Sequence, residues 1–262
     1  MDTRLSPAEL EELRAAKARL ENPSLAARIS EVVGAPIERG FELLPKSWSA
    51  VAKDAVHGAI EKALDVAIWS MGDRKPRASS DRWHKLAVIT TGAAGGALGL
   101  SALSIELPIS TALILRSIAD IARAEGEDLA SAETKVQCIQ VLALGGRSPR
   151  DDAAEAGYFA ARAAMARAVS EAAAYIADKG LTTGGPALVR LIAQVASRFS
   201  VTVTEKAAAQ AVPVIGAFGG AVLNSLFIDH FQDVARGHFT VRRLERAHGA
   251  DEVERAYATL RV

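Results

Sequence analysis

Two long uncharged segments dominate the pattern of polar and apolar positions along the chain. The first covers twenty residues from Leu86 to Ile105, and the second covers twenty-two residues from Ala207 to Ile228. A helix that is apolar on all sides is buried in a protein core or in a membrane, and amphipathic helices surround it. The pattern therefore predicts two central helical segments inside a shell of amphipathic helices.

The two segments share a pattern of small residues. The sequence GAAGGAL at Gly92–Leu98 matches GAFGGAV at Gly216–Val222, and a serine follows at the same offset, at Ser101 and Ser225. The similarity has two explanations, a decayed internal duplication or chance in a chain rich in alanine and glycine. Because small side chains let helix backbones approach closely, we expect the two segments to pack against each other.

Most of the remaining chain follows a helical pattern with recognisable start and stop signals. Ser6-Pro7-Ala8-Glu9 is a capping box with proline in the first turn, and it predicts a charged helix that ends near Leu20. By the same rules for capping residues, glycine and proline, further helices are expected at residues 24–34, 36–44, 47–71, 108–124, 131–144, 152–178, 186–199 and 240–249, and from residue 251 onward.

One short β-branched run, Ser200–Thr204, departs from this pattern. Five residues without a partner strand do not build a sheet, so we expect the run to end or distort a helix. The chain is predicted to be all-α, a multi-helix bundle with the two small-residue-rich apolar segments at its centre. We expect one domain, 1–262, in which residues 1–22 form a peripheral helix and residues 23–262 form the main body.

Composition narrows the classes of function. The 262 residues include 31 Lys or Arg and 31 Asp or Glu, which leaves no basic excess, so no nucleic-acid partner is expected. Cys138 is the only cysteine, and we expect it to be a buried apolar filler in a reducing compartment. The N-terminus carries charged helix-forming residues and no apolar signal-peptide core. We therefore expect a cytoplasmic protein, peripheral at the cytosolic face of a membrane.

The length of the uncharged segments raises the question of a membrane span, since about 20 apolar residues cross a bilayer. Only seven of the twenty residues of Leu86–Ile105 are large aliphatics, and the charge of Glu106 offsets their small insertion free energies. The sequence favours a buried central pair and leaves two alternatives, a fold that sits on or inserts conditionally into a membrane and one that spans it. The basic loop Gly72–Ser80, followed by Arg82 and Lys85, fits either a solvated linker or a contact with anionic lipid headgroups.

Glu106 is the most conspicuous ionisable residue, because it stands between two apolar stretches and shortly before Pro108. Three interpretations are open. Glu106 is a corner residue that faces solvent or caps a helix beginning at Pro108, or a buried glutamate paired with an arginine or lysine that helps to hold a ligand cavity, or a general acid/base. The first interpretation is favoured.

A second polar cluster comprises Asp229, His230 and Asp233. Its spacing on one helix face is compatible with a divalent metal, but no second cluster of ligands matches it. We therefore expect a polar helix end with an ion pair between Asp233 and Arg236, and no metal or other cofactor. The sequence contains none of the familiar motifs for a nucleophile elbow, a phosphate-binding loop or a zinc protease.

Three groups of residues carry a family resemblance, which covers the chain from about Asn22 to the C-terminus. They are Glu106-Leu-Pro-Ile-Ser-Thr111 with Leu115–Ala122 and Glu125–Asp128; Lys206 with Pro213–Ala221, Asn224 and Phe227; and Ala235, Phe239, Arg243–Glu245, Gly249 and Tyr257. In these residues and their joint spacing the chain is similar to the EcsC family. The resemblance implies a bacterial, membrane-associated role beside an ABC transporter, because the family takes its name from the third member of an operon that encodes transporter-like proteins. It implies no catalytic residues.

We therefore expect a non-enzymatic helical protein that binds lipid or another apolar partner at the cytosolic membrane face. The residues expected to contribute to binding lie beside or within the apolar segments: Glu106, Pro108, Thr111, Arg116, Gly216, Gly219, Gly220, Asn224, Asp229 and Asp233. The alternatives are a hydrolase that acts on a lipid or peptide through Glu106 or the Asp229–His230–Asp233 cluster, and a purely structural scaffold for protein partners.

Overall fold

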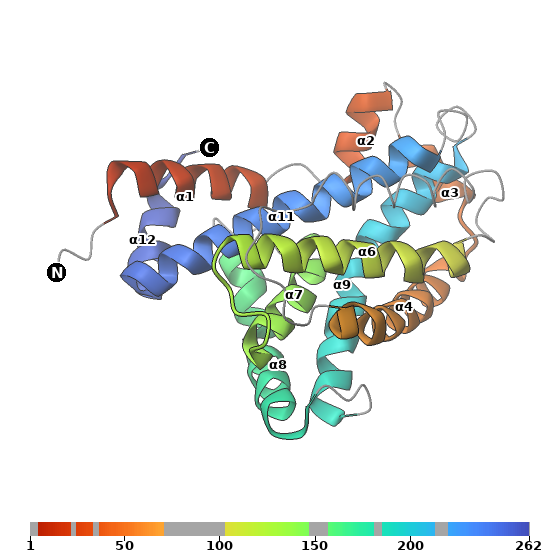
Figure 1. Ribbon diagram of the computed structural model, residues 1–262. Coiled ribbons are helices and arrows are strands. Elements are labelled where there is room, and N and C mark those ends of the chain that lie inside the picture. Colours follow the sequence, from red (N-terminus) through yellow and green to blue (C-terminus); the bar gives the residue numbers. More distant parts are fainter. Residues whose placement is uncertain are drawn as a thin grey trace.

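The structure, a computed structural model, describes residues 5–21, 25–33, 37–70, 103–146, 157–180, 185–212 and 220–261. Within these ranges the chain forms ten helices and no strand, which confirms the predicted all-α bundle (Figure 1). In chain order the helices are α1 (Pro7–Leu20), α2 (Leu25–Val33), α3 (Glu38–Leu43), α4 (Trp48–Ser70), α6 (Leu103–Ala124), α7 (Ala132–Leu144), α8 (Gly157–Lys179), α9 (Pro186–Ala211), α11 (Gly220–His248) and α12 (Ala250–Thr259).

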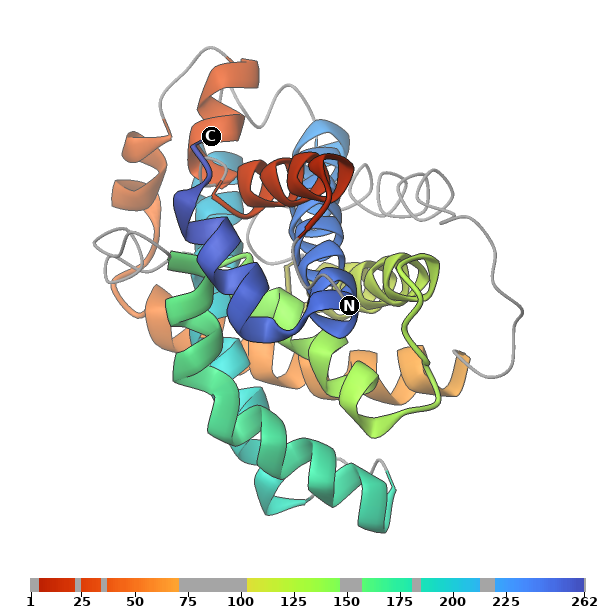
Figure 2. The same ribbon diagram turned by 90° about the vertical axis from the view of Figure 1, so that its left-hand side faces the viewer.

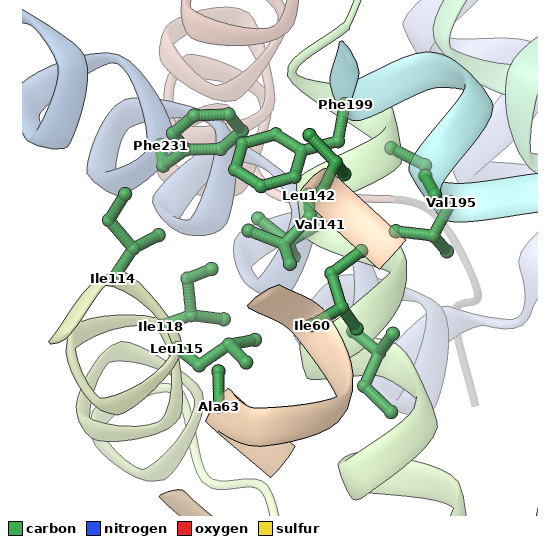
Figure 3. Packing of buried hydrophobic residues seen from close by; sticks show 14 of the residues in the cluster. Ile60, Ala63, Ile114, Leu115, Ile118, Val141, Leu142, Val195, Phe199 and Phe231 are labelled. Atoms are coloured by element: carbon green, nitrogen blue, oxygen red, sulfur yellow. The ribbon is translucent and has the colours of Figure 1, made fainter. Parts of the chain in front are cut away.

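The main core lies where α4, α6, α7, α9 and α11 meet. Helix α4 packs on both α6 and α9, α11 packs on α6, and α7 lies against α8 and α9. Figure 3 shows large aliphatic and aromatic side chains from all five helices filling the space between them. The labelled ones are Ile60 and Ala63 of α4, Ile114, Leu115 and Ile118 of α6, Val141 and Leu142 of α7, Val195 and Phe199 of α9, and Phe231 of α11.

A second, smaller cluster fixes α1 to the C-terminal part of the chain. Leu13 and Ala16 of α1 are fully buried against Val241 and Leu244 of α11 and Tyr257 of α12. The Lys17 ammonium donates hydrogen bonds to the carbonyl oxygens of Tyr257 and Leu260, at 3.0 and 2.8 Å, where α12 ends. The long helix α11 therefore reaches from the main core at one end to this cluster at the other (Figures 1 and 2).

Local start and stop signals are confirmed at several helices. Ser6 and Glu9 form the reciprocal capping box of α1, the Ser131 hydroxyl accepts from the Thr134 backbone N–H at the start of α7, and Gly249, with φ of +91°, follows the end of α11. Cys138 is buried, as expected, and burial raises the pKa of its thiol to about 12.

The expectation for the β-branched run was wrong. Helix α9 continues without a break through Ser200–Thr204 to Ala211. Val203 is fully buried, and the Thr202 hydroxyl donates to the carbonyl oxygen of Gly145 at 3.2 Å. These tertiary contacts outweigh the weak helix propensity of β-branched residues, which amounts to less than about 1 kcal/mol each.

The expected helix start at Thr240 was also wrong. Thr240 lies inside α11, and its hydroxyl donates to the Glu125 carboxylate at 3.4 Å instead of capping a backbone N–H. A threonine that finds a partner on a neighbouring helix no longer competes with its own helix for hydrogen bonds. Residues 220–248 consequently form one helix.

The two uncharged segments do not both form single central helices. Residues 86–102, including Gly92–Leu98, lie outside the described residues, as does Pro213–Gly219, so the expected contact between the two glycine-rich stretches also lies outside them. The second segment is divided, because α9 ends at Ala211 and α11 begins at Gly220. A single apolar helix from Ala207 to Ile228 was therefore a wrong prediction.

Among the described helices, α9 alone is long and apolar enough to cross a membrane. In the most apolar stretch of α9, 50% is buried inside the structure. The expected basic loop Gly72–Ser80, with Arg82 and Lys85, falls outside the described residues.

Candidate functional site

A buried ion pair between α6 and α9 stands at the centre of the predicted site. The Lys206 ammonium donates a hydrogen bond to Oε1 of Glu106 at 2.6 Å, and the two side chains are 1% and 5% exposed. The ammonium also lies 4.7 Å from the centre of the Phe227 ring of α11, a distance at which a cation is attracted to an aromatic face. Charge and ring together connect the three helices α6, α9 and α11.

This arrangement corrects the favoured interpretation of Glu106. Helix α6 begins at Leu103, so Glu106 lies in its first turn and Pro108 lies inside the helix, not at its start. Pro108 lacks the backbone N–H that would donate to the carbonyl of Ser104, so α6 lacks one hydrogen bond of its helical pattern there. The solvent-facing corner was wrong. The pairing of a buried glutamate with a lysine is confirmed, whereas its part in holding a ligand cavity stays a prediction.

Burial and pairing act on Lys206 in opposite directions. Burial lowers the pKa of the Lys206 ammonium, and the negative charge of Glu106 opposes that shift. Removing one member of a buried pair leaves the other charge without compensation, which costs about 3–5 kcal/mol in proteins. The pair therefore holds α6 and α9 in one fixed position relative to each other.

The other predicted residues of α6 and α11 differ in their burial. Thr111 is fully buried, and its hydroxyl has no hydrogen-bond partner in the described part of the chain. Asn224 is fully buried one turn before Phe227 on α11, whereas Arg116 is half-buried. Gly216 and Gly219 lie outside the described residues, and Gly220 is the first residue of α11.

The cluster Asp229–His230–Asp233 is held by structural contacts on α11. Nε2 of His230 lies 2.7 Å from the carbonyl oxygen of Gly145, which accepts the hydrogen bond at the end of α7. Asp233 pairs with Arg28 of α2 at 3.1 Å and with Arg236 at 3.4 Å, so the expected ion pair within α11 is confirmed. Among the described residues no group of three His, Cys, Asp or Glu side chains is placed to hold a metal.

Sequence reasoning missed a buried chain of hydrogen bonds, which we call the polar relay: Gln137, His238, Tyr158, Arg162 and Glu245. Nε2 of His238 lies 3.0 Å from the Gln137 side-chain oxygen, and Nδ1 lies 2.9 Å from the Tyr158 hydroxyl. Arg162 donates to that hydroxyl at 3.3 Å and to both oxygens of Glu245 at 2.7 and 3.1 Å.

The relay is consistent with a neutral imidazole. Burial holds the pKa of His238 well below its usual value, and the positive charges of Arg162 and Arg242 act in the same direction. A neutral His238 donates from Nε2 to Gln137 and accepts at Nδ1 from Tyr158, so each ring nitrogen has one suitable partner. Gln137, Tyr158 and His238 lie on three helices, and no local pattern of the sequence links them.

A charged junction joins the turn after α6 to the C-terminal half of α11. Arg242 donates to Glu127 at 2.8 Å, Arg243 donates to Glu125 at 2.8 Å, and Arg246 also pairs with Glu127. Burial alone would raise the pKa of the Glu127 carboxyl, but the hydrogen bond and charge of Arg242 lower it overall. The segments Glu125–Asp128 and Arg243–Glu245, which carried part of the family resemblance, thus contact each other.

Two hollows lie on either side of Glu133 and Glu245. A groove of about 510 Å³ runs between α7 and α8 below the start of α12, and a hollow of about 410 Å³ lies over the charged junction. Neither Glu106 nor the Asp229–His230–Asp233 cluster lines either of them.

Fold and site together define an all-α bundle with a buried ion pair between α6 and α9 and an arginine-rich junction on α11. The model of the EcsC protein family matches residues 7–244 of the 262-residue chain, and the chain belongs to this family. No curated protein and no solved structure matches the chain.

Proposed function

We propose that this EcsC protein is a non-enzymatic helical protein that binds lipid or another apolar partner at the cytosolic face of a membrane. Its binding surface is the end of the bundle formed by α2, α3 and the first turns of α4. The observation that carries the proposal is the exposure of four large apolar side chains there, Val32, Phe41, Leu43 and Val51, at 59%, 42%, 58% and 53%. We call these four residues the apolar end.

The apolar end is assembled around the last turns of α9. Trp48 of α4 donates its indole N–H to the Thr204 hydroxyl at 3.1 Å, and the Glu205 carboxylate accepts a hydrogen bond from the Ala26 backbone N–H at the start of α2. Gly40 of α3 lies so close to α9 that a Cβ at this position would clash with the Ala208 carbonyl oxygen. Three helices are therefore fixed to residues 204–208, and their outer faces carry the exposed side chains.

The position of the apolar end supports the proposal. Figure 1 places α2, α3 and the start of α4 at the same end of the molecule as the first residues of α6 and α11. The described parts of the two uncharged segments at the starts of α6 and α11 therefore lie at this end. Single exposed apolar side chains are ordinary on a protein surface, whereas a group of them marks a site of interaction with lipid or protein.

The buried ion pair has a supporting role in this function. Lys206 follows Glu205 on α9, so the link from Lys206 to Glu106 fixes the turn that carries α2, α3 and α4. Breaking the pair would leave a buried charge without compensation, so the pair holds α6 and α9 together next to the apolar end. The family context extends the proposal to a membrane-protein partner such as an ABC transporter.

Flotation with vesicles tests the proposal. Purified protein is mixed with phosphatidylcholine vesicles, with and without phosphatidylglycerol, and centrifuged through a density gradient. We expect wild-type protein in the vesicle fraction, and more of it with the anionic lipid. The variant Phe41→Ser/Leu43→Ser removes two exposed apolar side chains, each worth about 1 kcal/mol or more when buried, so binding is expected to fall about tenfold or more.

The matched control is Val189→Ser, which removes an exposed apolar side chain near the start of α9, far along the helix from the apolar end. This control is expected to float like the wild type. Equal flotation of all three proteins would refute the apolar end as the binding surface, and no flotation of any of them would refute lipid binding.

The hydrolase alternative stays a prediction that the described contacts do not favour. Glu106 forms an ion pair with Lys206, and Asp233 forms ion pairs with Arg28 and Arg236. His230 is hydrogen-bonded to the Gly145 carbonyl oxygen. A general base must lie within reach of a substrate proton, and none of these three residues lines either hollow.

A further inference from the structure

The groove between α7 and α8 combines an apolar floor with a polar wall. One face of α8 supplies Phe159, Ala163, Ala166, Val169 and Ala173, of which only Val169 is buried. Successive turns of α7 supply Glu133, Gln137 and Gln140 to the opposite wall, and Glu245 and Glu254 close one end. Its volume of about 510 Å³ lies within the range of sites for small ligands.

Gln140 is the unusual residue of this wall. Its side chain is only 2% exposed, yet in the described part of the chain its amide makes no hydrogen bond. The amide is not among the side-chain atoms sealed from solvent, so its small accessible part faces the groove that it lines. A buried amide that lacks a partner costs free energy, and a protein keeps such a group where a ligand or water completes it.

The other polar groups of the groove are already engaged. Gln137 binds His238, Arg162 holds both oxygens of Glu245, and Arg242 donates to Glu133 at 3.0 Å. Glu254 remains as a carboxylate without an ion pair to any described residue. The groove therefore offers one hydrogen-bonding amide along its length and uncompensated negative charge at one end.

Spacing along α7 sets the size of a fitting ligand. Gln140 follows Glu133 by two helical turns, which corresponds to about 10 Å at 1.5 Å per residue. We propose that the groove binds a small amphiphilic amine whose ammonium lies at the acidic end, beside Glu133 and Glu254. Its apolar chain lies over the alanines of α8, and a neutral amide or hydroxyl group about 10 Å away pairs with Gln140. This site is independent of the apolar end.

A matched series of eight-carbon compounds tests the proposal on the full-length protein. The series comprises 8-aminooctanamide, octylamine, octanamide and suberic acid monoamide, in which a carboxylate replaces the ammonium. Binding is measured by titration calorimetry and by the side-chain amide signal of Gln140 in ¹⁵N-labelled protein. We expect 8-aminooctanamide to bind at least tenfold more tightly than octylamine or octanamide and to shift the Gln140 signal, and suberic acid monoamide not to bind.

The variant Gln140→Leu separates a ligand-binding role from a structural one. Because leucine replaces an amide without a partner by an apolar group of similar volume, we expect an unchanged or higher unfolding midpoint together with at least tenfold weaker binding of 8-aminooctanamide. Gln194→Leu, an exposed site on α9, is the matched control and should leave binding unchanged. Ser170→Phe fills the groove from the α8 side and should abolish binding while the Gln140 signal remains.

Two results would overturn the proposal. One is that none of the four compounds shifts the Gln140 signal. The other is that Gln140→Leu lowers the unfolding midpoint as much as Gln137→Leu, which breaks the bond to His238, because Gln140 would then have a structural role.

Discussion

The two halves of α11 contact the rest of the bundle through different chemistry. Phe227 of the N-terminal half stacks on Phe199 of α9 and lies against the ammonium of the buried ion pair Glu106–Lys206, which joins α6 to α9. The C-terminal half meets α7 and α8 through the polar relay, in which His238 has a suitable partner on each ring nitrogen. In the ion pair beside the first half, each charge has one partner. In the relay, the hydrogen bonds are distributed over five residues. The comparison indicates that a single substitution should damage the ion pair more than the relay.

The largest effect is expected from breaking the ion pair. Glu106→Gln leaves the Lys206 ammonium buried without its counter-charge, and the free energy of unfolding should fall by about 3–5 kcal/mol. Urea denaturation followed by circular dichroism measures it. The double variant Glu106→Leu/Lys206→Met removes both charges and should recover most of the loss. A double variant as unstable as Glu106→Gln would contradict the account of the pair.

The next effect concerns Glu205, which lies beside Lys206 on α9 but has no counter-charge among the described residues. Burial raises the pKa of its carboxyl to about 7, although the Ala26 N–H acts against this shift. The folded state thus binds the proton more tightly than the unfolded state. The stability that Glu205 contributes is complete below about pH 4.5 and is lost as the pH rises through 7.

Glu205→Gln should therefore raise the free energy of unfolding at pH 8.5 by roughly 2–3 kcal/mol and change little at pH 4.5. Urea denaturation at both pH values measures the difference. Glu31→Gln, at an exposed position on α2, is the control and should show no such dependence. An equal effect of Glu205→Gln at the two pH values would contradict the raised pKa of the Glu205 carboxyl, and with it the difference between the unpaired Glu205 and the paired Lys206.

A smaller effect is expected from the relay. Tyr158→Phe removes the donor to Nδ1 of His238 and should lower the free energy of unfolding by about 1–3 kcal/mol, because one buried acceptor loses its partner. Thermal unfolding checks the stability, and NMR titration of His238 checks the imidazole, which should stay neutral at pH 7 in the wild type because burial lowers its pKa. A loss as large as that of Glu106→Gln would remove the contrast between the two halves of α11.

The smallest effect is expected at the protein surface. Glu171 pairs with Arg167 and Arg190 at 2.8 Å each, but all three side chains are accessible to solvent. Exposed ion pairs contribute little to stability because solvent screens them, so Glu171→Gln should leave the midpoint of urea denaturation almost unchanged. Urea denaturation at low and high salt provides the check, and a loss as large as that of Tyr158→Phe would mean that pairing at the surface matters as much as hydrogen bonding in the core.

The sequence predicted features that depend on neighbouring residues. The capping box at Ser6 and Glu9, the start of α7 after Ser131 and the stop at Gly249 each depend on a few consecutive residues, and all are present. The all-α class followed from the same local patterns. The predictions of a helix end at Ser200–Thr204 and of a helix start at Thr240 were wrong because the hydrogen-bond partners there, Gly145 and Glu125, come from other parts of the chain.

The candidate site was predictable only in part. Glu106 stood out because a charge between apolar segments is rare, but its partner Lys206 lies a hundred residues away and nothing local joins them. Gln140 and His238 carry no signal in the sequence, since a buried amide or imidazole is recognised by its surroundings and not by its neighbours along the chain. The exposed side chains of the apolar end were missed for the same reason, because exposure depends on the whole fold.

The depth of the apolar end in a bilayer tests the proposed function most directly. The only cysteine, Cys138, is buried with a pKa raised to about 12, so an environment-sensitive fluorophore can be attached selectively to Leu43→Cys or to Val189→Cys. With phosphatidylglycerol-containing vesicles, the label at position 43 should shift to the blue and be quenched by brominated lipid, and the label at position 189 should not change. Equal responses at the two positions, or none at position 43, would contradict the account.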